Sequence, residues 1–289
     1  MALKKFVAGV LLLALFAPWP ARAFDLNINL DKLRDVITQQ LKPMSEKDEI
    51  QLGRGVAANL LGAAPLVPDA SLQAYVNRLG KWLAMHSDRP NLPWHFGVLD
   101  TESVNAFATP GGYVFITRGL LLQMRDEAEL AGVLAHEISH VGEKHALETM
   151  RKGAFLEFAG ETLGEALRKE GSPEFTKLVS AGTEIFARGL DKQDEFAADR
   201  MGVVIAARAG YDAYGLPGTL QTLAAINPRD DAVALMFKTH PDPAERLERL
   251  LNAMEGKLDR YGDQPKVADR FSRVMQAHIT SYQPKSGKK

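Results

Sequence analysis

The stretch Leu130-Ala-Gly-Val-Leu-Ala-His-Glu-Ile-Ser-His-Val141 carries two histidines four residues apart, His136 and His140, with Glu137 directly after the first. Its apolar residues recur at helical spacing, which predicts a helix. Side chains at positions i and i+4 lie one above the other on a helix, so both imidazoles can reach one ion. From its position beside the first ligand, Glu137 can accept a proton from a water molecule held at that ion. The stretch therefore predicts half of a zinc site with its general base.

The start of this helix supports the same interpretation. Asp126 with Glu129 has the pattern of a capping box, which begins the helix about two and a half turns before His136. The alternative is that His-Glu-x-x-His arose by chance on a solvated helix. The apolar flanks argue against chance, because an unpaired imidazole on a half-buried helix is costly.

Zinc hydrolases keep three protein ligands and leave the fourth position open to water. Glu195, at the start of another predicted helix, can supply the third ligand. Asp199 follows one turn later, where it can accept the second N–H of a ligand histidine. Two solvated acids on a surface helix are the alternative. His145 is a rival ligand, but at about 100° per residue it points away from the face of His136. We expect His145 on the surface or beside a ligand.

The composition is that of a globular chain, with 289 residues of which 46% are hydrophobic and 25% charged. Residues 1–23 differ, because Lys4 and Lys5 precede a short apolar run that ends before a small-x-small cleavage site. This pattern predicts a cleaved signal peptide and export to the periplasm. A membrane anchor is the alternative, but the run is shorter than the roughly twenty residues that span a bilayer. The absence of cysteine excludes disulfides and thiolate ligands.

Removal of Lys4, Lys5 and Arg22 from the 35 basic residues leaves 32 basic and 36 acidic residues. The mature chain therefore carries a formal charge of −4 and shows no basic cluster. We expect neither nucleic acid nor anionic lipid as a partner. No apolar run in the mature chain is long enough for a transmembrane segment.

Along the mature chain, residues 24–44 form an amphipathic arm. Helices are predicted from a cap at Ser45 to about residue 61 and from residue 69 to about 85. Residues 95–100 and 113–117 read as short strands. The expected fold class is α+β, mostly helical, with a small β-sheet next to the His-Glu-x-x-His helix.

Two segments near the predicted site suggest roles in substrate binding. Tyr113, Val114 and Phe115 begin a strand that could bind an extended substrate by β-addition, although an ordinary core strand is an equal alternative. Residues 153–190 are helical in pattern but contain six glycines, each of which weakens a helix by roughly 1 kcal/mol. They are predicted to form a mobile helical flap.

Four motifs carry a resemblance to a known family: Asn105-Ala-Phe-Ala-Thr-Pro-Gly-Gly-Tyr-Val-Phe115, Glu127 to His145, Glu195-Phe-Ala-Ala-Asp199 with Gly202, and Thr239-His-Pro-Asp-Pro-Ala-Glu-Arg246. Over roughly residues 45–255 the chain resembles the zinc metallopeptidase family of HtpX and the CAAX prenyl endopeptidases, in its soluble periplasmic branch. The resemblance implies a zincin-like fold and one zinc ion per chain.

The resemblance also assigns roles to single residues. His136, His140 and Glu195 would bind zinc, and Glu137 would be the catalytic acid and base. Asp199 matches a second acidic position that is often described as a proton donor, whereas its spacing favours an orienting role. The resemblance implies two further site residues: His240, as a latch on the metal's open position or a stabiliser of the oxyanion, and Arg246, which could assist it.

The expected organisation is a metallopeptidase domain over 45–256 followed by a C-terminal helix and disordered tail over 257–289. Soluble members carry a C-terminal array of helical repeats, but only 33 residues follow Gly256, too few for the three or so repeats of such an array. We therefore expect a version without these repeats.

The expected function is zinc-dependent hydrolysis of polypeptides, with misfolded or stalled outer-membrane proteins as the favoured substrates. A periplasmic chaperone or assembly factor with a latched or structural zinc site is the alternative from another class. A metal-dependent amidase acting on cell-wall peptides would share the site and differ in substrate.

Overall fold

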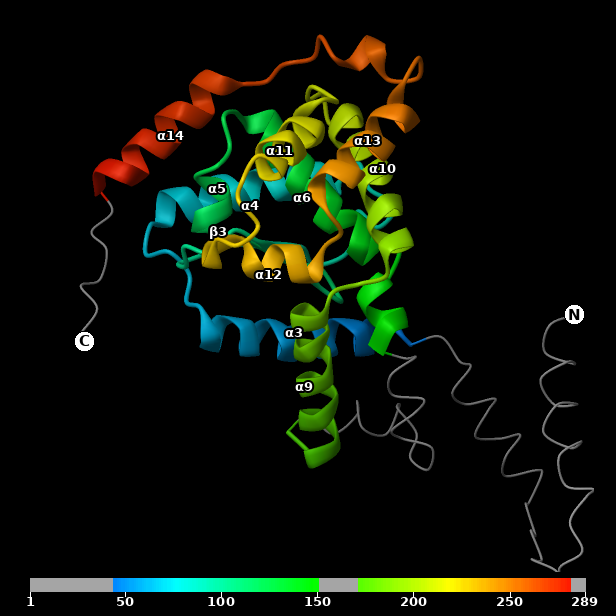
Figure 1. Ribbon diagram of the computed structural model, residues 1–289. Helices are drawn as coiled ribbons and strands as arrows, with labels where there is room; N and C mark the ends of the chain where they lie inside the picture. Colours follow the sequence, from blue (N-terminus) through cyan, green and yellow to red (C-terminus); the bar gives the residue numbers. More distant parts are fainter. Residues whose placement is uncertain (1–43, 151–170, 282–289) are drawn as a thin grey trace, which may run out of the picture. The chain divides into compact units, whose positions relative to one another are not determined.

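A three-stranded sheet lies between helices in the computed structural model, which describes residues 44–150 and 171–281 (Figure 1). The strands are β1 (His95–Leu99), β2 (Ala106–Thr109) and β3 (Tyr113–Thr117), in the spatial order β1-β3-β2. β1 runs parallel to β3, and β2 runs antiparallel to it. The mixed sheet is small, as expected.

Helices cover both faces of this sheet. Alternate side chains of β3 point to opposite faces, so Val114 and Ile116 join the main core while Phe115 joins a second cluster with Ala57. The main core is shared with α4 (Ala70–Ala84) and α6 (Glu127–Gly142), and the second cluster is covered by α3 (Glu46–Ala63). The sheet thus supports the histidine helix from one side.

The starts of these three helices are as predicted, including the caps expected at Ser45 and Asp126. Ser45 accepts from the Asp48 backbone N–H, and Asp126 accepts from that of Glu129. Asp69 accepts from two backbone N–H groups in the first turn of α4. These bonds satisfy donors that a helix N-terminus leaves without an intrahelical partner.

The predicted role of Tyr113, Val114 and Phe115 in β-addition is wrong. They lie in the central strand, which is hydrogen bonded on one side to β1 and on the other to β2. β3 therefore has no edge to which a substrate strand could add. The other side of β1 is occupied by α4, whose Gln73 side chain bonds to both backbone groups of Val98. The edge strand on the opposite side is β2, which was not predicted from the sequence.

The remaining helices extend the fold beyond α3, α4 and α6. They are α5 (Arg118–Leu121), α9 (Pro173–Arg188), α10 (Lys192–Arg208), α11 (Gly215–Ala224), α12 (Asp231–Thr239), α13 (Pro243–Met254) and α14 (Ala268–Ser281), with a 3-10 turn at Asp259–Tyr261. α10 and α11 pack on α6, α13 packs on both of them, and α14 packs on α4 and α6. The fold class is α+β and mostly helical, as predicted.

Several expectations fall on segments outside the described residues. These are the signal peptide 1–23, the arm 24–44 except for its last residue, the part of the flap from 153 to 170, and the tail from 282. In the described part of the flap, α9 begins at Pro173 and packs on α3. Among residues 44–150 and 171–281, no helix has both the length and the apolar character needed to cross a bilayer.

Candidate metal centre

Helix α6 is buried along almost its whole length, more deeply than the predicted half-buried helix. Every residue from Glu127 to Val141 is buried, because the sheet, α4, α10 and α11 surround the helix. Gly202 allows α10 to approach at the level of His136, since a Cβ on this glycine would lie 2.9 Å from the His136 Cα. The absence of a side chain there brings the polar residues of α10 close to the two histidines.

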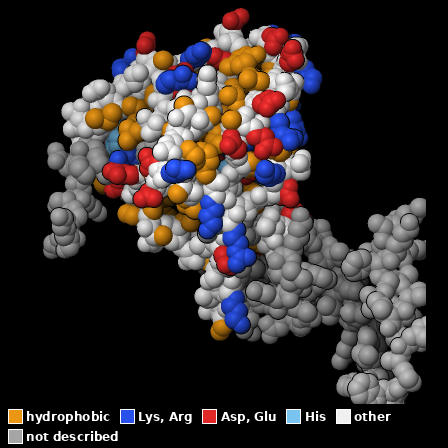
Figure 2. All heavy atoms as spheres, in the orientation of Figure 1, with side chains coloured by type: hydrophobic (Ala, Val, Ile, Leu, Met, Phe, Trp, Pro, Cys, Tyr) orange, Lys and Arg blue, Asp and Glu red, His pale blue; other side chains and the backbone are white. Residues whose placement is uncertain are grey.

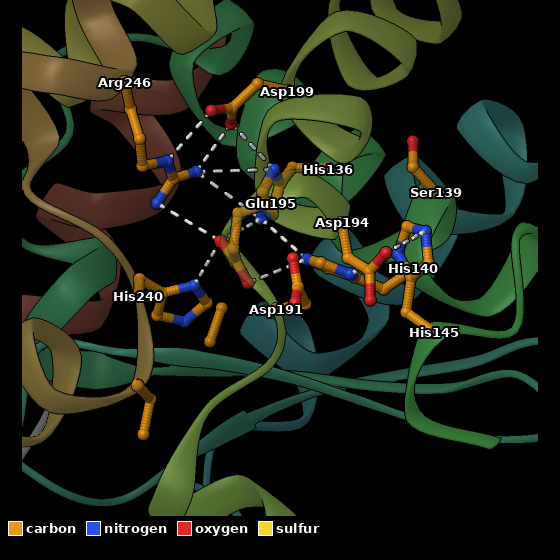
Figure 3. A network of polar contacts seen from close by, with 12 residues as sticks. His136, Ser139, His140, His145, Asp191, Asp194, Glu195, Asp199, His240 and Arg246 are labelled. Carbon is orange, nitrogen blue, oxygen red and sulfur yellow. Dashed lines mark hydrogen bonds and ion pairs between the residues drawn. The ribbon is translucent and has the colours of Figure 1, made fainter. Parts of the chain in front are cut away.

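Three potential ligands converge between α6 and α10 (Figure 3). The Nε2 atoms of His136 and His140 lie 3.0 Å apart. The Glu195 carboxylate lies with Oε2 3.6 Å from His136 Nε2 and Oε1 3.4 Å from His140 Nε2. All three side chains are buried. Within the described parts of the chain, this is the group of three His, Cys, Asp or Glu residues that could hold a metal ion.

The donor set fits a zinc ion. Two ligand atoms about 2.05 Å from a tetrahedral zinc are about 3.3 Å apart, close to the three observed separations. Glu195 Oε1 is buried and, among the described residues, has no hydrogen-bond partner. An acceptor left in this way costs free energy unless a cation or donor meets it. Two imidazole nitrogens and a carboxylate oxygen are also ligands that zinc accepts.

The protonation states of His140 and Glu195 favour the binding of a cation. Burial lowers the pKa of His140 well below its usual value, so this imidazole is neutral at pH 7 and has a free lone pair. Burial raises the pKa of Glu195, but His240, His140 and Arg246 lower it more, and the net pKa lies well below its usual value. Glu195 is therefore a carboxylate at neutral pH.

Asp199 and Arg246 hold the far side of His136. Asp199 Oδ1 lies 2.9 Å from His136 Nδ1, one turn along α10 from Glu195. Arg246, on α13, donates to both Asp199 oxygens, at 2.9 and 2.6 Å. Burial raises the pKa of Asp199, but Arg246 and His136 lower it to well below its usual value. As a carboxylate, Asp199 accepts the Nδ1–H of His136, which directs the Nε2 lone pair towards Glu195.

His145 has the corresponding position beside His140. Its Nδ1 lies 2.9 Å from His140 Nδ1, and its side chain is buried. If His140 Nε2 binds the ion, its Nδ1–H donates to His145, whose Nε2–H then faces Asp194 Oδ1 at 3.8 Å. His145 is not among the three converging ligands. It is the residue beside a ligand that we expected, but it turns towards the histidines rather than away from them.

His240 contacts the third ligand. It follows α12, where its backbone N–H donates to Met236 O, and its Nδ1 lies 2.8 Å from Glu195 Oε2. Burial lowers the pKa of His240, whereas Glu195 raises it, and the net pKa is above its usual value. Arg246 Nη1 lies 3.8 Å from the same oxygen. His240 and Arg246 are thus brought to the site, each in contact with Glu195.

Glu137 faces a small cavity beside the histidines. Burial raises the pKa of this carboxyl above its usual value. The cavity, about 40 Å³ in volume, is lined by Glu137, His136, His240 and Arg246, and by residues that the sequence analysis did not select as site residues. The latter are Asn105, Ala106, Leu120, Val133, Leu216, Thr219, Leu220, Leu223 and Met236. Asn105 and Ala106 belong to a motif used for the resemblance, but no spacing rule linked them to the histidines.

Comparison with known proteins places the chain in a family. Residues 70–254 match the model of peptidase family M48. The chain is 34% identical over 255 residues to the beta-barrel assembly-enhancing protease of Escherichia coli K12, covering 85% of this chain and 51% of that protein. It is 33% identical to the protein of the same name from Yersinia pestis, over 77% of this chain and 47% of the relative.

A more distant relative is the mitochondrial metalloendopeptidase OMA1 of Arabidopsis thaliana, 27% identical over 68% of this chain and 39% of that protein. The chain spans about half the length of the beta-barrel assembly-enhancing proteases that it matches. The family match includes all of α4, α6, α10 and α13, and therefore every residue of the converging site. The resemblance expected from the motifs is confirmed: this chain belongs to the metallopeptidases of family M48.

Proposed function

We propose that this chain is a zinc-dependent endopeptidase that cleaves misfolded or stalled polypeptides in the periplasm, outer-membrane proteins among them. The observation that carries the proposal is that His136, His140 and Glu195 converge, and that one buried oxygen of Glu195 has no hydrogen-bond donor among the described residues. These three residues would hold one zinc ion. Bound zinc supplies Lewis-acid chemistry, which polarises a carbonyl and makes water a stronger acid.

Glu137 transfers the proton during hydrolysis. Glu137 accepts a proton from the attacking water as a C–O bond forms at the scissile carbonyl. It then returns that proton to the amide nitrogen as the C–N bond breaks. Burial among the residues of the cavity limits access of other water to this carboxylate. Asp199 orients His136 rather than taking part in this transfer, as its 2.9 Å contact with Nδ1 suggests.

We propose that Arg246 balances charge at the site and that His240 affects either this charge or access to the ion. Arg246 is a buried cation in contact with Glu195 and Asp199 of α10, so it can balance negative charge that develops during hydrolysis. His240 either donates to that charge or, as a latch, restricts access to the ion. Its replacement in His240→Ala separates these roles, because loss of a latch raises proteolysis and loss of a donor lowers it.

The cellular setting is proposed from the sequence and the relatives. The pattern of residues 1–23, in which basic residues precede a short apolar run and a small-x-small site, favours export. The name of the 34% identical relatives, beta-barrel assembly-enhancing protease, favours substrates linked to β-barrel assembly. On the face shown in Figure 2, Lys and Arg side chains are interspersed with Asp and Glu. We further propose that residues 45–256 form the catalytic domain.

Metal analysis and casein digestion of the wild type and Glu137→Gln test the enzymatic proposal. We expect one zinc ion per chain in both proteins, because Glu137 is not a ligand. Proteolysis should fall by about 10²–10⁴-fold in Glu137→Gln, the usual contribution of a general base. Equal digestion by both proteins would remove Glu137 from the mechanism, and a wild type without bound metal would remove the zinc.

The contact between His240 and Glu195 at 2.8 Å favours one alternative, a chaperone or assembly factor whose zinc site is latched. This alternative requires no turnover. In cells, Glu137→Gln would then retain the full function of the wild type, whereas an endopeptidase would lose it. The same variant therefore separates the two functions.

A further inference from the structure

One buried carboxylate joins α3 to three neighbouring segments. Glu49, on α3, is 1% exposed, and Arg89 donates to both of its oxygens, at 2.7 and 3.1 Å. The Nζ atom of Lys144 lies 3.6 Å from Glu49 Oε2. The backbone N–H of Gly111, in the turn between β2 and β3, donates to Glu49 Oε1 at 3.1 Å. A carboxylate that is met by groups from segments following α4, α6 and β2 restricts how these segments can lie.

Two of these contacts hold the connection between His140 and His145. Arg89 Nη1 also donates to the carbonyl oxygen of Val141, directly after the first histidine, at 3.3 Å. Lys144 directly precedes the second histidine. The same carboxylate therefore holds both ends of the connection, one through Arg89 and the other through Lys144.

This connection has an unusual backbone conformation. Lys144 has a positive φ of 60°, which only a few per cent of residues other than glycine adopt. Because of this turn, His145 comes back towards α6, and its Nδ1 lies 2.9 Å from Nδ1 of His140. A conformation of this kind persists where surrounding contacts determine it. The ion pair between Lys144 and Glu49 is such a contact, because the direction of the lysine side chain depends on φ.

We propose that Glu49 is a positioning residue of the metal centre, which acts through His145 on the ligand His140. By holding Lys144 at positive φ, Glu49 keeps His145 where it can accept the Nδ1–H of His140, so that the Nε2 lone pair of His140 is available to the ion. The inference rests on the zinc site of the proposed function. Glu49 lies outside residues 70–254, so the centre depends on a part of the chain that the family model does not match.

The variant Glu49→Gln tests the positioning role, with Glu127→Gln as a matched control. Glutamine keeps the size of Glu49 but removes the charge that meets Arg89 and Lys144. Glu127 is also 1% exposed and paired with an arginine, Arg270, but it lies at the other end of α6. We expect the zinc dissociation constant, from competition with a chelator, to rise about tenfold in Glu49→Gln and to stay unchanged in Glu127→Gln.

Two results of this comparison would overturn the proposal. One is wild-type zinc affinity in Glu49→Gln. The other is an equal loss of affinity in Glu127→Gln, because any buried glutamate beside α6 would then have the same effect and the role of Glu49 would be general to the fold.

A double-mutant cycle with His145→Ala tests the route of the effect. His145→Ala should weaken zinc binding by about 10–100-fold, the usual effect of losing the partner of a metal ligand. In this background Glu49→Gln should cause no further loss, because the partner that Glu49 positions is absent. The same tenfold loss with and without the His145 side chain would show that Glu49 does not act through His145, and would overturn the proposal.

Lys144 provides a test that leaves the buried carboxylate in place, in case Glu49→Gln does not fold. Lys144→Met should weaken zinc binding about threefold, the usual effect of one partly exposed ion pair. Lys144→Arg keeps the cation and should bind zinc as the wild type does. The visible absorption bands of the cobalt-substituted proteins, which report ligand geometry, should change in Lys144→Met and not in Lys144→Arg. Equal affinities and spectra in the two variants would contradict the proposal.

These measurements do not require turnover. A wild type that binds zinc but digests no casein would contradict the proposed peptidase function and leave the role of Glu49 intact. Proteolysis by the wild type together with unchanged zinc affinity in Glu49→Gln would do the reverse. A wild type that binds no zinc would overturn both.

Discussion

Each histidine of the centre has one ring nitrogen facing Glu195 and the other facing a polar partner. His136 has Asp199 at 2.9 Å, and His140 has His145 at 2.9 Å. Both partners determine which nitrogen carries the proton, so both Nε2 atoms can present a lone pair to the ion. The spacing of the histidines was sufficient to predict their common face.

The direction of His145 was not predictable from helical spacing. The angle of about 100° per residue holds only while the helix continues. α6 ends at Gly142, and Lys144 then takes a positive φ of 60°, which turns the chain back. His145 therefore reaches the Nδ1 of His140. No proline marks the end of this helix in the sequence. The contact between His145 and His140 was therefore not predictable.

Asp199→Asn should weaken zinc binding by about 10–100-fold, the usual effect of losing a partner that orients a metal ligand. The amide removes the negative charge that holds the Nδ1–H of His136, and it leaves the buried Arg246 without the nearer of its two carboxylates. Zinc dissociation constants from competition with a chelator measure this effect. Asp191→Asn is the control, because Asp191 caps the same helix in an exposed position and asparagine caps equally well.

The same variant distinguishes the two roles considered for Asp199. A proton donor can be lost without a change in zinc affinity, since it acts on the substrate. Wild-type affinity together with lost proteolysis in Asp199→Asn would therefore exclude the orienting role.

At the scale of elements, the sequence predicted the structure correctly where a local interaction determines it. The caps at Ser45, Asp69 and Asp126 each begin a helix as predicted. β2 was missed because Ala106–Thr109 is short and half of it is alanine, which strands disfavour. Its pairing with β3 decides that β3 is internal, and strand order is a tertiary property that periodicity does not contain.

The packing of α3 on the turn between β2 and β3 depends on a glycine. A Cβ at Gly53 would lie 1.6 Å from the carbonyl oxygen of Pro110, a backbone atom that cannot move without moving the turn. Gly62 is in the same helix and exposed, and no described atom lies within 4 Å of a Cβ built there. The two glycines therefore differ in packing but share a helical setting.

Gly53→Ala should lower the free energy of unfolding by about 1–3 kcal/mol, the usual cost of overpacking. Gly62→Ala should raise it by about 0.5–1 kcal/mol, because alanine restricts the unfolded chain and favours a helix. Urea denaturation followed by circular dichroism gives both values. Stabilisation by both substitutions would mean that α3 does not approach the turn as closely as described.

At the scale of the molecule, the site is assembled from distant parts of the chain. Glu195 comes from α10, His240 follows the end of α12, and Arg246 comes from α13. All three side chains lie against α6. Helical spacing predicted Glu195 and Asp199 as site residues, whereas His240 and Arg246 were expected from the family motifs. Asn105 belongs to one of these motifs but was given no role, because its unpaired buried Nδ2 is visible only when the neighbouring described residues have been placed.

This assembly makes folding and metal binding depend on each other. Folding buries Glu195 with one oxygen that has no hydrogen-bond partner in residues 44–150 and 171–281, and only the folded chain brings the three metal ligands together. A ligand that binds the native state alone stabilises it by about 4 kcal/mol at a thousandfold excess over its dissociation constant. For a domain of this size, about 2–4 °C in Tm corresponds to 1 kcal/mol, so removal of zinc by EDTA should lower the Tm by roughly 10 °C.

Two variants make this prediction specific to the centre. Glu195→Ala removes a ligand, so EDTA should leave its Tm unchanged, whereas Glu137→Gln keeps all three ligands and should respond as the wild type does. Differential scanning calorimetry with and without EDTA, after zinc loading, compares the three proteins. An equal decrease in Glu195→Ala would assign the stabilising ion to another part of the chain, since a site without its carboxylate binds zinc too weakly to contribute.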